Sequence, residues 1–205
     1  MNTDYKFKFQ CTRCGTCCTD RNTIVNLTIT DLSRLKNGLN LDIDDLLEIT
    51  SFYVLHESPT PEIIDKMVIP PILSERGKSF VALRKKKDGN CIFYNQEKKM
   101  CRIYSIRPCL CRTFPFSFRL SENKKIKILI TEKGKQYCPG LNEQAPLINV
   151  ESWKSLGNKA LIDLEKNAVF IMNWNEKEKN PTARKFLEKV SSISQHSERK
   201  PKKQS

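Results

Sequence analysis

The chain has 205 residues and carries 36 Lys and Arg against 23 Asp and Glu, so its formal net charge is +13. That length allows one domain with a hydrophobic core and a small appendage, and the 29% of charged residues fits a globular protein. The sequence shows neither a secretory signal nor an apolar stretch of the roughly 20 residues that span a bilayer, so we expect a cytoplasmic protein without membrane contact.

Four cysteines lie close together near the start of the chain, in the run C-T-R-C-G-T-C-C from Cys11 to Cys18. We expect residues 5–18 to form a loop, in which Gly15 adopts a backbone conformation that residues with a side chain resist. Such turns are typical of metal-binding loops, because they direct several cysteine sulfurs toward one point.

Two helix starts follow the cysteine run. Thr28 and Asp31 have the spacing of an N-terminal capping box, and the helix that they begin is expected to end at Gly38. Asp42 is a typical helix cap, and apolar residues at helical spacing extend the second predicted helix to about Leu55.

The rest of the chain mixes short strands with helices. In chain order we expect a helical turn at 62–67, strands at 79–86 and 90–95, a helical turn at 102–107, a strand at 126–131, and helices at 151–174 and 181–194. The pattern predicts an α+β fold, a small metal-stabilised domain of loops and short antiparallel strands flanked by helices.

These elements suggest three successive segments. We expect a cysteine-cluster metal-binding domain over 1–142, a C-terminal helical segment over 143–195 that packs on it, and a disordered basic tail over 196–205. The tail holds no apolar residue to bury, so a solvated basic face is its simplest interpretation. Weak binding to nucleic acid is the functional alternative, because a basic surface attracts polyanions.

Nine cysteines are present in total, an odd number that fits poorly with a closed set of disulfides. Clustered thiols in a reducing compartment indicate metal ligands. The two-residue spacing that directs two sulfurs at one ion occurs at Cys11/Cys14 and again at Cys14/Cys17. Adjacent side chains diverge, so one of Cys17 and Cys18 is expected to turn toward a second site or to bridge.

The later motif joins this cluster to a known family. The chain carries Leu27-Thr28 with Asp31, Cys91, Cys101-x-Ile103-Tyr104, Arg107-Pro108, Cys111-Arg112, Phe114-Pro115 and Cys138. Together with C-x-x-C-x-x-C-C, this pattern resembles the YkgJ-type cysteine cluster proteins, which are described as zinc- or iron-chelating domains. The resemblance covers residues 9–140.

The resemblance implies metal binding through eight cysteines. They are Cys11, Cys14, Cys17, Cys18, Cys91, Cys101, Cys111 and Cys138. Eight thiolates fit two four-coordinate sites, or one site and a redox pair. Dense thiolate ligation favours an iron–sulfur cluster, of the 4Fe-4S type, whereas zinc held by four cysteines has the same spacing and stays an alternative. Cys109 lies outside the family pattern and is expected to be a buried thiol that takes no part.

Arginines adjoin the cysteines, at Arg13, Arg102, Arg107 and Arg112. Each would lower the pKa of a neighbouring thiol and offset the negative charge of a thiolate site. An equally simple interpretation is that these side chains cap helices or form ion pairs elsewhere.

Three functions follow from these patterns. The first is an iron–sulfur protein in electron transfer or redox sensing, with a redox partner protein. The second is a zinc-stabilised interaction module that binds nucleic acid. The third is an enzyme similar to flagellin lysine N-methylase, which shares the cysteine motif. The sequence contains no G-x-G and no Walker A loop, so no nucleotide or S-adenosylmethionine site is predicted, and the catalytic residues are unknown.

Overall fold

The computed structural model describes residues 6–56 and 68–198, with side chains up to residue 193. The chain divides into two compact units, each built from two separate stretches of sequence. Unit 1 is Met1–Thr23 with Lys85–Glu165, and unit 2 is Ile24–Arg84 with Lys166–Ser205. The sequence analysis divided the chain differently, into successive segments with boundaries at 142 and 195, and that division stays a prediction.

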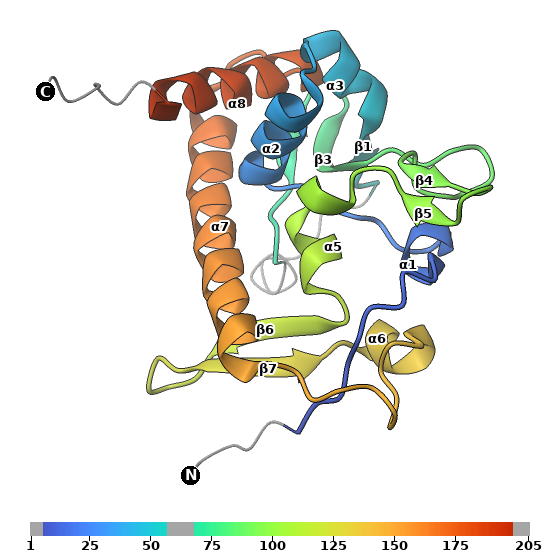
Figure 1. The fold of residues 1–205 in the computed structure, drawn as a ribbon. Coiled ribbons are helices and arrows are strands. Elements are labelled where there is room, and N and C mark those ends of the chain that lie inside the picture. Colours follow the sequence, from blue (N-terminus) through green and yellow to red (C-terminus); the bar gives the residue numbers. More distant parts are fainter. Residues whose placement is uncertain (1–5, 57–67, 199–205) are drawn as a thin grey trace, which may run out of the picture. The chain divides into compact units, whose positions relative to one another are not determined.

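The fold is α+β, as the sequence predicted (Figure 1). Its strands form small antiparallel sheets, and helices precede, separate and follow them along the chain. The predicted helical turn at 62–67 lies outside the described residues, as does the tail from residue 199 onward. Within the described part of the chain, no helix combines the length and the apolar character needed to cross a membrane.

Unit 2 contains a three-stranded antiparallel sheet in the order β1-β3-β2. Its strands are β1 (Thr50–Val54), β2 (Ile72–Ser74) and β3 (Gly77–Leu83). Its helices are α2 (Ile29–Leu39), α3 (Ile43–Ile49), α8 (Ala183–Glu198) and the second part of α7 (Val150–Lys177). Leu35, Leu46 and Leu187 are almost wholly buried, which places the core of this unit among α2, α3 and α8.

The capping boxes of unit 2 confirm the predicted helix starts. Thr28 and Asp31 exchange the two expected hydrogen bonds, from the Asp31 amide to the Thr28 hydroxyl and from the Thr28 amide to the Asp31 carboxylate. Asp42 and Asp45 do the same for α3. The first helix continues to Leu39, slightly past its predicted end, and stops where Asn40 adopts a left-handed conformation.

The second predicted helix was wrong beyond Ile49. It was expected to reach about Leu55, but Thr50–Val54 is strand β1, paired with β3 from Thr50↔Leu83 to Val54↔Ser79. Its residues are β-branched, aromatic or small, and these favour extended backbone where a partner strand is available. That partner lies about 30 residues further along the chain, beyond the reach of a local pattern.

Unit 1 holds the remaining elements. They are α1 (Thr16–Thr19), β4 (Tyr94–Asn95), β5 (Met100–Cys101), the short 3₁₀ helix η1 (Tyr104–Ile106), α5 (Cys109–Thr113), β6 (Phe116–Leu120), β7 (Ile126–Ile130), α6 (Glu132–Tyr137) and the first part of α7. The strand expected over 90–95 is present only as Tyr94–Asn95, and it pairs with β5.

The core of unit 1 is aromatic and lies on the β6–β7 hairpin (Figure 1). Phe116 is buried and its ring contacts those of Phe7, Phe9 and Trp153, with centroid distances of 5.6, 5.4 and 4.7 Å. Backbone bonds from Phe9 to the Pro146 carbonyl and from Ile148 to the Phe7 carbonyl attach the N-terminal segment to this core. The start of the cysteine run is thereby fixed to the same unit that carries the later cysteines.

Candidate metal centre

The N-terminal cysteine run turns tightly around Gly15. Its φ of 82° lies in the left-handed region, and a Cβ at this position would be 2.4 Å from the Tyr94 hydroxyl oxygen. Only glycine fits such a position, which confirms the conformation expected for Gly15. The turn starts α1, in which the Cys18 amide donates to the Gly15 carbonyl at 2.7 Å and the thiols of Cys17 and Cys18 follow in succession.

Backbone hydrogen bonds bring two later cysteines to this turn. The Cys91 amide donates to the Cys18 carbonyl at 2.8 Å, and the Tyr94 amide donates to the Cys91 carbonyl at 2.9 Å. Tyr94 in turn pairs with Cys101 across β4 and β5. Three cysteines that are up to 83 positions apart in the sequence are therefore linked by consecutive short contacts.

Cys111 joins this group from α5. Its thiol is close enough to Cys17, Cys91 and Cys101 for their charges to interact. Cys109, two residues earlier on the same helix, is buried, as predicted, and forms no disulfide. The group so far consists of Cys17, Cys18, Cys91, Cys101 and Cys111, and we call it the five-thiol group.

The other three predicted ligands form a second group, which we call the three-thiol group: Cys11, Cys14 and Cys138. The Gln10 amide donates to the Gly140 carbonyl at 3.0 Å, which holds the residue before Cys11 beside the turn after Cys138. The Cys14 sulfur lies 3.2 Å from the Thr16 hydroxyl. The charges of Cys14 and Cys17 also interact, so the two groups adjoin each other.

The adjacent thiols Cys17 and Cys18 differ in their acidity. A hydrogen bond from the Cys18 thiol lowers the pKa of Cys17 to about 7; burial opposes this shift and the Arg107 charge adds to it. The same hydrogen bond, together with burial and the neighbouring thiols, raises the pKa of Cys18 well above its usual range. In the metal-free chain the two thiols interact with each other, and the expectation that one of them turns toward a second site or bridges stays a prediction.

Burial raises the pKa of most of the other thiols. Burial is the largest cause at Cys91, Cys101, Cys111 and Cys138. The charges of neighbouring cysteines add a smaller increase to the pKa of each. Several thiolates cannot be held at such close range without a compensating cation, because their charges repel in a poorly solvated site. Binding of a metal cation would supply that charge and displace the thiol protons.

Arg107 supplies part of the positive charge near the five-thiol group. Its charge lowers the pKa values of Cys17, Cys101 and Cys111, in opposition to burial, which raises all three. Its guanidinium carbon lies 3.7 Å from the centre of the Tyr104 ring. The guanidinium carbon of Arg13 lies over the same ring at 4.3 Å, so Tyr104 contacts two cations.

The donor set suits a metal that prefers sulfur. All eight predicted ligands belong to unit 1, and thiolates are ligands of zinc and of iron–sulfur clusters. Among the residues that the structure describes, no three Cys, His, Asp or Glu side chains already stand at the spacing that one bound metal ion requires. Binding an ion would therefore require the sulfur atoms of its ligands to move closer together.

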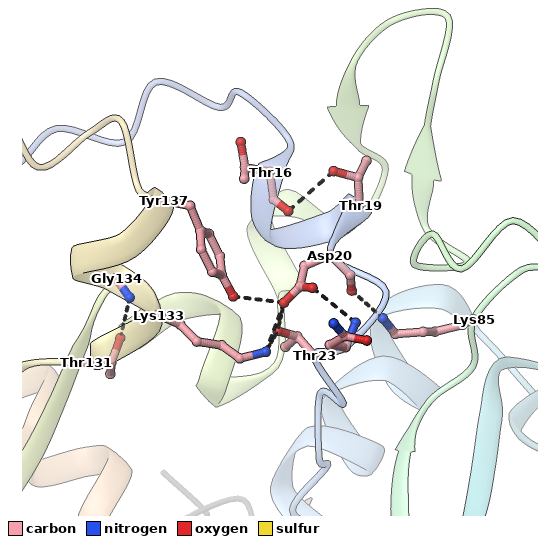
Figure 2. Close-up of polar contacts among 10 residues, drawn as sticks. Thr16, Thr19, Asp20, Thr23, Lys85, Thr131, Lys133, Gly134 and Tyr137 are labelled. Atoms are coloured by element: carbon pink, nitrogen blue, oxygen red, sulfur yellow. Dashed lines mark hydrogen bonds and ion pairs between the residues drawn. The ribbon is translucent and has the colours of Figure 1, made fainter.

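Sequence reasoning missed a network of polar contacts centred on Asp20, which lies two residues after Cys18 (Figure 2). The Asp20 carboxylate accepts hydrogen bonds from the side chains of Thr23, Lys133 and Tyr137 and from the Asn22 amide. These hydrogen bonds hold the pKa of Asp20 well below its usual range, and the one from Thr23 contributes most. Lys133 and Tyr137 are more than 110 positions away in sequence, so no local pattern indicates the network.

Comparison with known proteins identifies the class to which this chain belongs. Residues 10–139 match the family described as "CxxCxxCC: Putative zinc- or iron-chelating domain", and the chain is a member of that family. The match contains all eight predicted ligand cysteines, and it confirms the resemblance that the sequence motif suggested.

A curated relative is the "Uncharacterized protein MJ0661" of Methanocaldococcus jannaschii, which is 26% identical over 134 residues. The similarity covers 65% of this chain and 58% of the relative, so the chain matches a little over half of that protein's length. No solved structure matches the chain. The family thus supports metal binding in general terms and does not distinguish zinc from iron.

Proposed function

We propose that the eight cysteines hold an iron–sulfur cluster, of the 4Fe-4S type, and that the protein serves electron transfer or redox sensing. The observation that carries this proposal is the five-thiol group, in which cysteines from four separate segments of unit 1 interact. A 4Fe-4S cluster and a structural zinc ion each take four thiolates, so the fifth thiol would be an adjoining ligand or redox thiol in either case. The cluster is favoured because dense ligation by cysteine alone suits iron–sulfur sites.

The exposure of the N-terminal cysteines supports a redox role. Cys11, Cys14 and Cys17 are exposed, and the later cysteines of both groups are only partly buried. A centre held here lies near the protein surface, where a partner protein can exchange electrons with it. When bound, the cluster would supply the redox chemistry. The residues of the chain would hold it and offset its negative charge, and Arg107, whose charge lowers the pKa of Cys101, is one of them.

Anaerobic purification with metal analysis tests this proposal. We expect a brown protein with broad visible absorption, and iron and acid-labile sulfide in comparable amounts. Reduction with dithionite should bleach the visible absorption, and reoxidation should restore it. A colourless protein with stoichiometric zinc and no labile sulfide would overturn the cluster assignment.

A zinc-stabilised module that binds nucleic acid is the second candidate. Arg119 lies directly opposite Lys127 on the exposed face of the β6–β7 hairpin, and Lys124 and Lys125 are exposed beside the turn that joins the two strands. Like charges opposite each other destabilise a strand pair, and an anionic partner would remove that cost. RNA binding that weakens as salt rises, and that falls in Arg119→Gln with Lys127→Gln, supports this function. A variant with Lys177→Gln and Lys179→Gln, two exposed residues of unit 2, controls for the loss of two positive charges.

A lysine N-methylase-like activity is the third alternative, and it follows from the shared cysteine motif alone. Binding of S-adenosylmethionine to the purified metal-loaded protein, measured by calorimetry, distinguishes it from the first two. Heat release that saturates with ligand supports it, and the absence of heat at high ligand concentration removes it.

A further inference from the structure

Asp20 sits at the end of the helix that carries Cys17 and Cys18. It is the C-cap residue of α1, and its amide donates to the Thr16 carbonyl at 3.1 Å. The carboxylate points away from this helix toward α6, as Figure 2 shows. Whatever fixes the Asp20 side chain therefore also fixes the last turn of α1, from which these two thiols project.

The α6 helix supplies two of the groups that hold Asp20. The Lys133 ammonium and the Tyr137 hydroxyl donate to the same carboxylate oxygen, at 2.9 and 2.8 Å. These residues are four positions apart and so lie on one face of the helix. Cys138 follows Tyr137 directly as the C-cap of α6, so the contact that orients this helix also places the Cys138 thiol.

The start of α6 is fixed separately. The Thr131 side chain accepts from the Gly134 amide at 2.9 Å and donates to the Pro115 carbonyl at 3.0 Å. Two attachments at different points of a short helix leave it little freedom to rotate. The contact with Asp20 is the one that determines its orientation toward α1.

A third cysteine-bearing segment reaches the backbone of the same residue. The Lys85 ammonium donates to the Asp20 carbonyl oxygen at 2.5 Å. Lys85 forms an isolated β-bridge with Cys91, whose amide donates to the Cys18 carbonyl. Asp20 is thus the point at which the segments of Cys18, Cys91 and Cys138 are joined.

The charge of Asp20 is balanced. A carboxylate beside a group of thiolates would add to their repulsion, but two lysine ammonium groups contact this one residue. The network of Asp20, Lys85 and Lys133 carries a net positive charge. Asp20 can therefore connect the segments without making thiolate formation less favourable.

We propose that Asp20 is a positioning residue for the metal centre, which holds the thiol of Cys138 in register with those of Cys17 and Cys18. This inference rests on the proposed metal-binding function and applies whether the metal is zinc or iron. Asp20 is not expected to contact the metal. Its role is to fix the separation between the three-thiol group and the five-thiol group.

The variant Asp20→Asn tests this role with little change in shape. The Thr23, Lys133 and Tyr137 side chains all donate to one oxygen, Oδ2, so an amide oxygen can take that place only if its NH₂ group faces the Asn22 amide, which donates to Oδ1. In either orientation the negative charge that pairs with Lys133 is lost. Mutation of a residue that orients metal ligands without contacting the metal typically lowers metal affinity by about 10- to 100-fold. We expect Asp20→Asn to lower the affinity within that range.

Asp88→Asn is the matched control. Asp88 also accepts several hydrogen bonds and lies three residues before a cysteine, but its partners are all in its own loop, at Asn90 and Gln96. We expect it to change cobalt affinity by less than about threefold. Tyr137→Phe removes one contact and serves as the milder variant if Asp20→Asn does not fold.

Cobalt(II) binding to the metal-free full chain provides the measurement. The intensity of the sulfur-to-cobalt absorption reports how many thiolates bind each ion, and competition with a chelator gives the affinity. We expect Asp20→Asn to lower both, while circular dichroism of its metal-free form stays like that of Asp88→Asn.

A double-mutant cycle identifies the ligand through which Asp20 acts. Cys138→Ser should have a much smaller effect in the Asp20→Asn background than in the wild type, because the thiol it removes is already displaced. Cys101→Ser, whose segment does not contact Asp20, should have the same effect in both backgrounds.

The possible outcomes separate the two claims. Wild-type protein that binds no cobalt overturns both the metal-binding function and this inference. Wild-type binding with unchanged affinity in both Asp20→Asn and Tyr137→Phe overturns the inference alone. So does an equal loss in Asp88→Asn, or a Cys138→Ser effect that is fully additive with Asp20→Asn.

Discussion

The Cys91 amide donates a hydrogen bond of 2.8 Å to the carbonyl of Cys18, across 73 positions of sequence. This backbone contact joins the N-terminal cysteine run to Cys91, as the contact from Gln10 to Gly140 joins it to the turn after Cys138. It uses main-chain atoms only, so both thiols stay available as ligands. Cys101 is attached in turn, since Tyr94 bonds to Cys91 and pairs with Cys101.

Two cysteines on α5 should respond differently to replacement. Cys111→Ser should lose bound metal and destabilise the protein, because its thiol interacts with the rest of the five-thiol group and site formation is coupled to folding. Cys109→Ser replaces a buried thiol that the family motif does not include, so metal content should stay at the wild-type level. Metal analysis of both purified variants provides the comparison. Full metal content in Cys111→Ser would contradict the ligand assignment.

Metal affinity should rise with pH. The pKa values of Cys91, Cys101, Cys111 and Cys138 are raised by burial, so these thiols are protonated at neutral pH when no metal is bound. A metal must displace those protons, so its affinity should rise on the order of tenfold per unit increase in pH for each proton released. Calorimetry of zinc binding in buffers of different ionisation enthalpy counts the protons. Binding without proton release would contradict the raised pKa values.

The metal-free protein should show the opposite dependence. A thiol whose pKa is raised by folding contributes stability below its unfolded pKa, and that contribution is lost as pH rises. We therefore expect the free energy of unfolding of the metal-free form to decrease as pH rises through the usual range of thiol pKa values. Urea unfolding at a series of pH values measures this, and a rise in stability over the same range would be inconsistent with buried neutral thiols.

Cys17 should be the most reactive thiol of the metal-free protein. Its pKa of about 7 results first from the hydrogen bond donated by Cys18 and is assisted by Arg107, and its side chain is exposed. Alkylation at pH 7 followed by peptide mapping should label it first. Cys18→Ala removes the donor and should slow labelling several-fold, while Cys109→Ser should leave the rate unchanged. Equal rates in wild type and Cys18→Ala would show that this hydrogen bond is not formed.

Gly15→Ala should damage the metal site more than a comparable change elsewhere. The backbone at this position has a left-handed φ of 82°, and the added Cβ would overlap the buried Tyr94 side chain. We expect about 2–4 kcal/mol of lost stability, from backbone strain and overpacking together, and reduced metal content. Gly77→Ala is the control, because its φ is 97° but no atom lies within 4 Å, so only the backbone term of about 1–2 kcal/mol applies. Chemical denaturation measures both, and equal losses would exclude a role for the Tyr94 contact.

Thr28→Ala should lower stability without affecting metal. Thr28 is 1% exposed and its hydroxyl accepts from the Asp31 amide at the start of α2 in unit 2, whereas every predicted ligand is in unit 1. Loss of such a cap costs about 1 kcal/mol, with a further cost here because the site is buried. Thermal unfolding and metal analysis together test this. A parallel loss of metal would show that the centre depends on this helix.

The local features of this chain were predictable from sequence because they depend on neighbours. Thr28 and Asp31 specify a helix start by their spacing, Gly15 specifies a turn by its lack of a side chain, and the cysteine spacing with the family motif indicates thiolate ligation. The apolar period over 151–174 likewise predicted most of α7. Each of these signals is contained within a few turns of backbone.

Only the tertiary structure decided how distant segments combine. Thr50–Val54 became a strand because β3 was available as its partner, against the helical pattern of the residues before it. The division of the cysteines into two adjoining groups brings together residues up to 127 positions apart, and the contacts of Asp20 with Lys133 and Tyr137 span 113 and 117 positions. Sequence alone predicted thiolate ligands, since that prediction depends only on the residue type and its local spacing. It could not show which thiols meet, because long-range contacts arise from the packing of the whole chain.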